Sequence, residues 1–252
     1  MKCQRMKNEA LLAPFLVHPI AHRGLHNENI DENSLASFKE AIKNRYAIEI
    51  DVHLTKDYEV VVLHDSTLER VTGSAGKVEK MTINEIKRCS LLKTKEKIPL
   101  LWEVLELVNG QVPLLIELKV VNNREPLADA VIKTLENYRS KTMIAIQSFD
   151  PVVMRYLRKK YPKAYAYGQL ASRDIGNDQP FHVRLLFKTM LVNWISKPNF
   201  TAYDITYLPQ RKIKFIRRKM PVLTWTIDHD EKYQRAAKYA DNVIFEHIIP
   251  RD

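Results

Sequence analysis

The chain has 252 residues and a formal net charge of +10, because 40 Lys and Arg outnumber 30 Asp and Glu. Hydrophobic residues make up 45% of the sequence and charged residues 28%, a balance that excludes an intrinsically disordered protein. The sequence has no apolar run of about 18 residues, so no membrane-spanning helix is expected.

The N-terminal segment superficially resembles a secretion signal, since three basic residues precede an apolar run at residues 10–17. Glu9 and Pro14 interrupt this pattern, and no small-residue cleavage site follows it. We therefore expect a cytoplasmic protein. The two cysteines, Cys3 and Cys89, exclude a disulfide scaffold and a multi-cysteine zinc site, and we expect both to be free thiols.

Short β-rich runs alternate with helical patterns along the rest of the chain. Several runs are nearly continuous in Val, Ile and Leu, as in parallel strands buried on both faces. The predicted strands are Phe15–His22, Ala47–His53, Pro113–Lys119, Thr142–Ser148, Ala164–Gly168, Thr201–Ile205, Pro221–Ile227 and Asn242–Glu246. The predicted helices are Asn33–Asn44, Leu101–Val108, Leu127–Tyr138, Pro151–Tyr161, Leu185–Ile195, Gln210–Arg218 and Glu231–Tyr239. Eight strands, each followed by a helix or the chain end, predict an α/β fold of the (β/α)8 TIM-barrel class.

One stretch departs from this alternation. A hairpin is predicted with its turn near Lys56-Asp57 and its return strand at Val60–His64, followed by a short helical piece at Ile83–Cys89. We expect these residues to form a small insertion, 54–98, after the second strand. Because no linker or low-complexity segment divides the sequence, we predict a single domain over residues 1–252.

Acidic residues occur on two of the predicted buried strands. Glu49 and Asp51 are two residues apart on the second strand, so their side chains point to the same face. Glu117 and Lys119 share a face at the end of the next barrel strand. Since the C-terminal strand ends of such a barrel carry the chemistry, three carboxylates are expected to converge there. An oxygen-rich site of this kind suits Mg²⁺ or Ca²⁺; the alternative is a buried ion pair with Lys119.

Two histidines also lie at predicted strand ends. His22 ends the first strand and His64 ends the return strand of the insertion. Two histidines that flank a phosphate can act as general base and general acid near neutral pH. Arg23, next to the first histidine, offers the planar fork that binds two phosphate oxygens, and Gly24 permits a sharp turn or close approach to a ligand.

Taken together, these motifs resemble the glycerophosphodiester phosphodiesterase family over about residues 18–250. The resemblance rests on the order and spacing of several short motifs, each of which is weak alone. These motifs are His22-Arg23-Gly24, Glu32-Asn33, Glu49-Ile50-Asp51, Thr55-Lys56-Asp57, Val60–Asp65 with Leu68 and Arg70, Ile98–Leu105, Leu115–Lys119, Gln147–Phe149 and Leu223–Asp228.

The resemblance implies metal-dependent hydrolysis of a glycerophosphodiester to glycerol 3-phosphate and an alcohol, within lipid and glycerol metabolism. It implies a divalent metal held by the three carboxylates and an acid–base pair of the two histidines. Substrate contacts are implied for Arg23, Lys119 and Trp225. The partner is then a small phosphodiester. No zinc-finger spacing or RNP-like aromatic pair is found in the sequence, so nucleic acid is not expected, and the oligomeric state is left open.

Two segments depart from the family pattern. Near its end the chain reads Val243–Pro250, where the family has an Ile-Thr-Asp-x-Pro-like motif after strand eight. Residues 179–199 are unusually apolar and basic, which fits either an outer helix packed inward or an interfacial helix that contacts a membrane. Two alternative functions therefore remain. One is a lysophospholipase D-like phosphodiesterase at a membrane surface, and the other is a non-catalytic phosphate-binding barrel.

Overall fold

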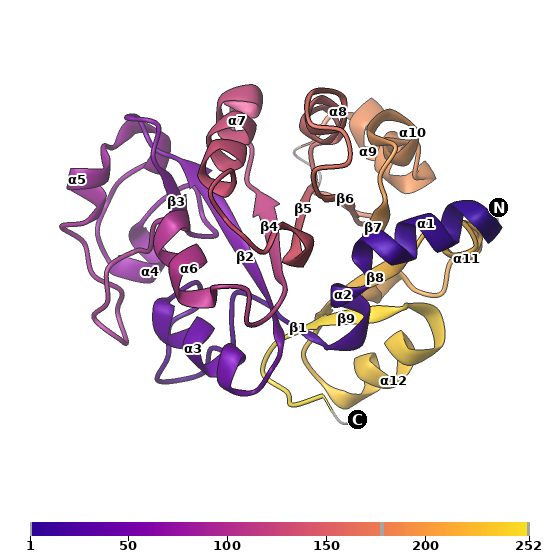
Figure 1. Ribbon diagram of the computed structural model, residues 1–252, viewed down its shortest axis with the longest axis horizontal. Coiled ribbons are helices and arrows are strands. Elements are labelled where there is room, and N and C mark those ends of the chain that lie inside the picture. The colour runs from indigo at the N-terminus through magenta and orange to yellow at the C-terminus, as the bar shows by residue number, and fades with distance from the viewer. Residues whose placement is uncertain (1, 177–178, 251–252) are drawn as a thin grey trace. The chain divides into compact units, whose positions relative to one another are not determined.

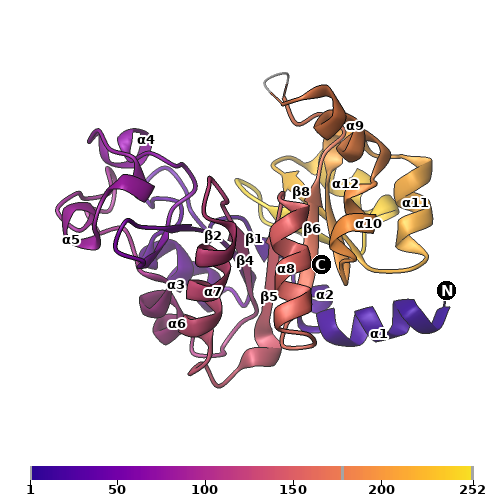
Figure 2. The ribbon, with the colours of Figure 1, turned by 90° about the horizontal axis from the view of Figure 1, so that it is seen from above.

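The structure is a computed structural model that describes residues 2–176 and 179–250. Backbone contacts divide it into two compact units. The first unit comprises Ala21–Ile144, and the second comprises Ala145–Asp252 together with Met1–Ile20. Figure 1 and Figure 2 show the helices and strands of each unit from two directions.

In the first unit, strands and helices alternate as expected, and the insertion adds short elements of its own. Strand β1, Ile20–Ala21, leads into this unit. The other strands are β2 (Ala47–Leu54), β3 (Val60–Val62) and β4 (Leu114–Leu118). The helices are α3 (Leu35–Lys43), α4 (Glu69–Thr72), α5 (Ile83–Ile86), α6 (Leu101–Val108) and α7 (Arg124–Leu135), with 3-10 turns at Val78–Lys80 and Lys141–Met143.

Strand β2 organises the first unit. All eight of its residues are buried, as expected for a strand covered on both faces. It pairs in parallel with β4, with Asp51 opposite Glu117, and antiparallel with β3, with Val52 opposite Val62. The predicted hairpin is therefore present, and β3 lies outside the strand–helix alternation.

The predicted insertion packs around a small apolar core of its own, which supports the segment that carries His64. Its buried members are Val61, Leu63, Leu68, Val71, Val78, Ile86, Leu91, Ile98 and Leu100. Cys89 is a free thiol that packs against this core; the side chain of Cys3 lies outside the described part of the structure.

The second unit continues the alternation. Its strands are β5 (Ile144–Ser148), β6 (Ala166–Ala171), β7 (Phe200–Asp204), β8 (Val222–Ile227) and β9 (Asn242–Phe245). They pair in parallel in this order. The helices are α1 (Lys2–Leu12), α2 (Pro14–Val17), α8 (Pro151–Lys160), α9 (Phe181–Thr189), α10 (Val192–Ser196), α11 (Arg211–Arg217) and α12 (Asp230–Tyr239), with a 3-10 turn at Ile205–Tyr207. Apart from β3, the strands of both units are those of a (β/α)8 barrel.

Two predicted elements differ from the structure. The first strand was expected over Phe15–His22, but residues 14–17 form helix α2 and the strand is limited to Ile20–Ala21. The helix expected over Leu185–Ile195 is divided into α9 and α10, because Met190 adopts a left-handed conformation with φ of 62°. Within the described residues, no helix is long and apolar enough to cross a membrane.

Candidate active site

Three carboxylates meet inside the first unit. Side chains alternate along β2, so Glu49 and Asp51 point to the same face. Glu117 joins them because it is the parallel-strand partner of Asp51 on β4. One carboxylate oxygen from each of the three residues lies within 4.8 Å of the others. The convergence expected from the strand pattern is therefore present in the structure.

This cluster is almost inaccessible to water, and burial dominates its electrostatics. Glu49 and Asp51 are 1% and 0% exposed. Burial raises the pKa of Glu49 well above its ordinary value, and repulsion from Asp51 and Glu117 raises it further. Burial also raises the pKa of Glu117, although Lys119 opposes this effect. For Asp51 the burial effect is outweighed by nearby positive charges, with Lys119 foremost, and its pKa is lowered.

The donor set fits a hard divalent cation. All three groups offer oxygen, which Mg²⁺ and Ca²⁺ prefer. Among the described residues, Glu49 Oε1 is buried without a hydrogen-bond partner, and such an atom is costly unless something else satisfies it. Asp51 Oδ1 is paired with the ammonium group of Lys119 at 3.0 Å. Burial raises the pKa values of Glu49 and Glu117, and positive charge beside them favours their ionised forms. A bound cation would supply positive charge and would give Glu49 Oε1 a partner.

Two basic side chains border the carboxylates. Lys119 Nζ lies 2.7 Å from Glu117 and 3.0 Å from Asp51. Arg23 Nε lies 3.3 Å from Asp51, and its Nη1 donates to Glu32 at 2.9 Å. These residues therefore reduce the repulsion within the cluster.

The backbone turns sharply as it leaves β1. Arg23 and Gly24 both adopt left-handed conformations, with φ of 56° and 79°, which is uncommon for a residue with a side chain. The turn lets the Arg23 backbone N–H donate to Glu49 Oε2 at 3.1 Å. A Cβ atom at Gly24 would lie 2.3 Å from Ser37 Oγ, so the turn requires glycine.

The two predicted catalytic histidines approach the same carboxylates. His22 follows β1 directly and is half-buried, and its positive charge is one of those that lower the pKa of Asp51. His64 follows β3, and the backbone N–H of Leu63 donates to the carbonyl of Asp51 at 2.9 Å. Burial lowers the pKa of His64, and Lys119 lowers it further. A neutral imidazole at this position can accept a proton near neutral pH.

Neighbouring groups hold His64 in place. Its Nδ1 lies 2.7 Å from Asp65 Oδ1, so the ring donates at Nδ1 and keeps Nε2 as an acceptor. The ring of His53, which shares the face of Glu49 and Asp51, donates from Nε2 to the backbone carbonyl of His64 at 3.0 Å. Burial lowers the pKa of His53, in keeping with a neutral structural donor.

Four further residues, to which the sequence pattern assigns no role, contact the site residues or one another: Glu32, Asn33, Asp65 and Arg70. Arg70 binds both oxygens of Glu32, at 2.9 and 2.6 Å, and Asp65 Oδ2 at 2.6 Å. Arg70 thereby links Glu32, which accepts from Arg23, to Asp65, which accepts from His64. Asn33, next to the capping residue of α3, donates to Asp51 Oδ2 at 2.9 Å. For Glu32, Asp65 and Arg70, the signal available in the sequence was their charge within ten residues of a predicted catalytic histidine.

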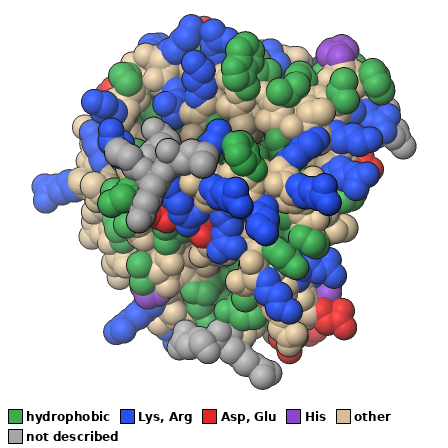
Figure 3. All heavy atoms as spheres, turned by 90° about the vertical axis from the view of Figure 1, so that its right-hand side faces the viewer, with side chains coloured by type: hydrophobic (Ala, Val, Ile, Leu, Met, Phe, Trp, Pro, Cys, Tyr) green, Lys and Arg blue, Asp and Glu red, His purple; other side chains and the backbone are tan. Residues whose placement is uncertain are grey.

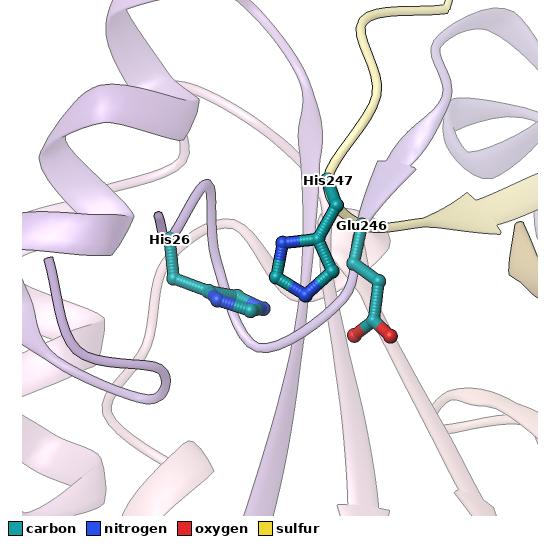
Figure 4. Close-up of side chains that lie close together, drawn as sticks. All are labelled: His26, Glu246 and His247. Atoms are coloured by element: carbon teal, nitrogen blue, oxygen red, sulfur yellow. The ribbon is translucent and has the colours of Figure 1, made fainter. Parts of the chain in front are cut away.

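The remaining predicted site residue lies in the second unit. Trp225 is on β8, and its ring packs edge-on against Phe149 with the centroids 5.6 Å apart. Its indole Nε1 is buried and has no hydrogen-bond partner among the described residues. Glu246 and His247 directly follow β9, as Figure 4 shows, at the point where the sequence departs from the family pattern.

Comparison with known proteins agrees with this arrangement. Residues 22–248 match the model of the glycerophosphoryl diester phosphodiesterase family. A glycerophosphodiester phosphodiesterase from Caldanaerobacter subterraneus is 29% identical over 229 residues, which cover 87% of this chain and 89% of that protein.

Solved structures show the same fold. A glycerophosphodiester phosphodiesterase from Thermotoga maritima has a TM-score of 0.69 at 26% identity, covering 90% of this chain and 94% of that one. An Oleispira antarctica phosphodiesterase, solved in complex with the product sn-glycerol-3-phosphate, has a TM-score of 0.79 at 22% identity, covering 93% of this chain and 94% of that one. The predicted TIM-barrel class and the predicted enzyme class, a phosphoric diester hydrolase, are confirmed. The chain belongs to the glycerophosphoryl diester phosphodiesterase family.

Proposed function

We propose that this protein hydrolyses glycerophosphodiesters to glycerol 3-phosphate and an alcohol, using a divalent metal and two histidines. The observation that carries the proposal is the convergence of three buried carboxylates, one of them with an unpartnered oxygen, beside two histidines and two basic side chains. The Oleispira antarctica relative, which was solved with sn-glycerol-3-phosphate, supports the same product here.

The metal would be held by Glu49, Asp51 and Glu117, and either Mg²⁺ or Ca²⁺ fits the oxygen donors. When bound, such an ion polarises a phosphoryl oxygen and stabilises the charge that develops on it. The carboxylates are buried on two adjacent strands, so the proposed ligands would be close together before substrate binds.

The basic side chains would hold the phosphate. Lys119 has three ammonium protons, and its contacts with Glu117 and Asp51 occupy two of them. Arg23 uses Nε and Nη1 toward carboxylates, which leaves Nη2 for a phosphate oxygen. The side chains of Lys119 and Arg23 would therefore contact the carboxylate cluster and the substrate phosphate at the same time. Trp225 would pack against the organic part of the substrate.

The two histidines would move the protons. One would take the proton of the attacking oxygen, which belongs to water or to the glycerol 2-hydroxyl, and the other would protonate the leaving alkoxide. His64 is set up for either task, since Asp65 fixes its Nδ1–H and leaves Nε2 toward the substrate. Loss of a general acid or base costs about 10²–10⁴-fold in rate.

A panel of glycerophosphodiesters tests this proposal. Glycerophosphocholine, glycerophosphoethanolamine and lysophosphatidylcholine are each incubated with Mg²⁺, Ca²⁺ or a chelator, and release of glycerol 3-phosphate or headgroup is measured. His22→Ala and His64→Ala should each lose about 10²-fold or more in kcat. His182→Ala, which replaces an exposed histidine on α9, is the matched control and should keep full activity.

The outcomes separate the competing functions. Headgroup release from lysophosphatidylcholine without turnover of glycerophosphocholine would favour the lysophospholipase D-like reaction. Metal binding without turnover of any diester would indicate a non-catalytic phosphate-binding barrel. Full activity of either histidine variant would contradict the role proposed for that residue.

A further inference from the structure

The positive charge of the chain is concentrated in one part of the second unit. Residues 179–219 contain nine Lys or Arg and one acidic residue, Asp204. This segment therefore carries +8 of the chain's formal charge of +10. It includes helices α9, α10 and α11, which follow the carboxyl ends of β6 and β7.

The same helices expose apolar side chains that the barrel does not use. Phe187, Met190 and Val192 are buried and supply the inward packing that an outer barrel helix needs. Phe181 and Trp194 are each 77% exposed, and both are large aromatic side chains. Leu185, Leu191 and Phe215 are also exposed. The segment therefore packs one face inward, as expected of an outer barrel helix, and exposes apolar side chains on another.

Helix α11 adjoins α9 and extends this surface. Lys212 Nζ donates to the backbone carbonyl of Lys188 at 3.2 Å. A groove of about 390 Å³ between these helices is lined by the apolar side chains of Met190, Phe215 and Ile216 and by the charged group of Arg211, among others. Apolar and basic side chains therefore line the same depression.

We propose that this surface binds an anionic membrane. We call it the basic-aromatic face, formed by Phe181, Leu185, Leu191, Trp194 and Phe215 with Lys188, Lys197, Arg211, Lys212 and Lys214. Figure 3 shows the side of the molecule where α1, α10, α11 and α12 lie, with basic and hydrophobic side chains interleaved and few acidic ones.

Charge complementarity identifies the occupant. Within the described residues, these five basic side chains form no ion pair with a carboxylate, whereas nearby Arg217 binds Asp241 at 3.0 Å. Protein surfaces that lie in the headgroup region of a bilayer combine exposed Trp and Phe with Lys and Arg. Anionic lipid attracts each basic residue, and the aromatic side chains insert between the headgroups. Attachment of this kind needs no membrane-spanning helix.

Vesicle sedimentation tests this inference with the full chain. Vesicles of equal parts phosphatidylglycerol and phosphatidylcholine are compared with vesicles of pure phosphatidylcholine. The wild type should bind the anionic vesicles and lose binding at high salt. Phe181→Ser with Trp194→Ser should weaken binding about tenfold or more through lost apolar burial. Lys188→Glu with Lys214→Glu should weaken it at least about 20-fold, since each basic residue contributes roughly fivefold.

Matched substitutions elsewhere serve as controls. Trp102→Ser replaces another exposed tryptophan, and Lys39→Glu with Lys43→Glu changes the charge equally on the exposed face of α3. Both should bind vesicles as the wild type does, and all variants should hydrolyse a water-soluble diester at the wild-type rate. Three results would overturn the inference. The Phe181/Trp194 variant could bind anionic vesicles as tightly as the wild type, or the α3 control could lose as much binding as the Lys188/Lys214 variant. The wild type could also fail to bind anionic vesicles. A dimer in solution that Trp194→Ser dissociates would overturn it too, because the face would then bind a second copy of the chain. Vesicle binding is measured without turnover, so its failure is distinguishable from failure of the proposed function.

Discussion

His64 donates a hydrogen bond from Nδ1 to Oδ1 of the adjacent residue Asp65, over 2.7 Å. The contact fixes the tautomer of the ring, because the proton on Nδ1 leaves Nε2 free to exchange a proton with substrate. Asp65 is itself held by Arg70, which also binds Glu32. One chain of ion pairs therefore orients a proposed catalytic base or acid and, through Glu32, the guanidinium of Arg23.

Asp65→Asn should lower kcat while leaving the fold intact. Loss of the carboxylate removes both the ring's orientation and one of the contacts that raise the pKa of His64. We expect kcat to fall by about 10²-fold, within the range for general acid–base catalysis. The limb of the pH–rate profile that His64 governs should also move to lower pH. An unchanged kcat would contradict the orienting role, and an unchanged profile would contradict the effect of Asp65 on the pKa of His64. Thermal unfolding of the variant provides the control for folding.

Arg70→Met should reduce stability at neutral pH and lose that effect in acid. Burial raises the pKa of Asp65, but hydrogen bonds from Arg70 and His64 outweigh it and depress the pKa to about 2; the pKa of Glu32 is lowered too. Carboxyl groups with depressed folded-state pKa values stabilise the protein above their unfolded pKa of about 4. This stabilisation is lost as the pH falls through the folded value.

The free energy of unfolding of Arg70→Met should therefore be about 1 kcal/mol lower than that of the wild type at pH 7, a modest value because Arg70 is half exposed. The difference should shrink between about pH 4 and pH 2. Denaturant unfolding at several pH values measures it. A difference that grows in acid would rule out the network as its source.

Metal affinity should fall as the pH is lowered. Burial and mutual repulsion raise the pKa of Glu49 and Glu117, so protons compete with the cation for the same oxygens. Isothermal titration of Mg²⁺ or Ca²⁺ should show weaker binding at pH 5 than at pH 7, with proton release on binding. Glu49→Gln should bind the ion weakly at both values. Affinity independent of pH would indicate a different site.

Gly24→Ala should impair folding and activity together. The residue has a φ of 79°, and an added Cβ would lie 2.3 Å from Ser37 Oγ and 2.9 Å from the ring of Phe38. The strain and overlap should cost about 1–3 kcal/mol. Differential scanning calorimetry of the variant measures the loss. Gly73→Ala has a similar φ of 73° but more space around its Cβ, so it isolates the contribution of the overlap and should be less destabilised.

The barrel strands could be predicted because their sequences leave few alternatives. Residues 47–54 and 114–118 are apolar runs in which the charged residues fall on one face, and period-two alternation then brings the three carboxylates together. The segment Phe15–Val17 was predicted as a strand and is helical, because a short apolar run fits either structure. The break at Met190 depends on a backbone conformation that apolar periodicity does not report.

The contacts that hold Arg23 and His64 in place could not be predicted in the same way. Arg70 and Glu32 are 38 residues apart, and they meet because the insertion folds on its own small core. No local pattern specifies that contact. His53 was accessible to prediction, since it shares a face with Glu49 and Asp51, yet its role follows from a hydrogen bond to the backbone of His64 that pattern alone does not show.

Hydrolysis of glycerophosphocholine with and without a divalent-metal chelator tests the central claim most directly. If Glu49, Asp51 and Glu117 hold a metal that the reaction requires, release of glycerol 3-phosphate stops when the chelator is added. It returns when Mg²⁺ or Ca²⁺ is restored to the wild type, and stays absent in Glu49→Gln. Undiminished release in the presence of chelator, or full activity of Glu49→Gln, would contradict the account.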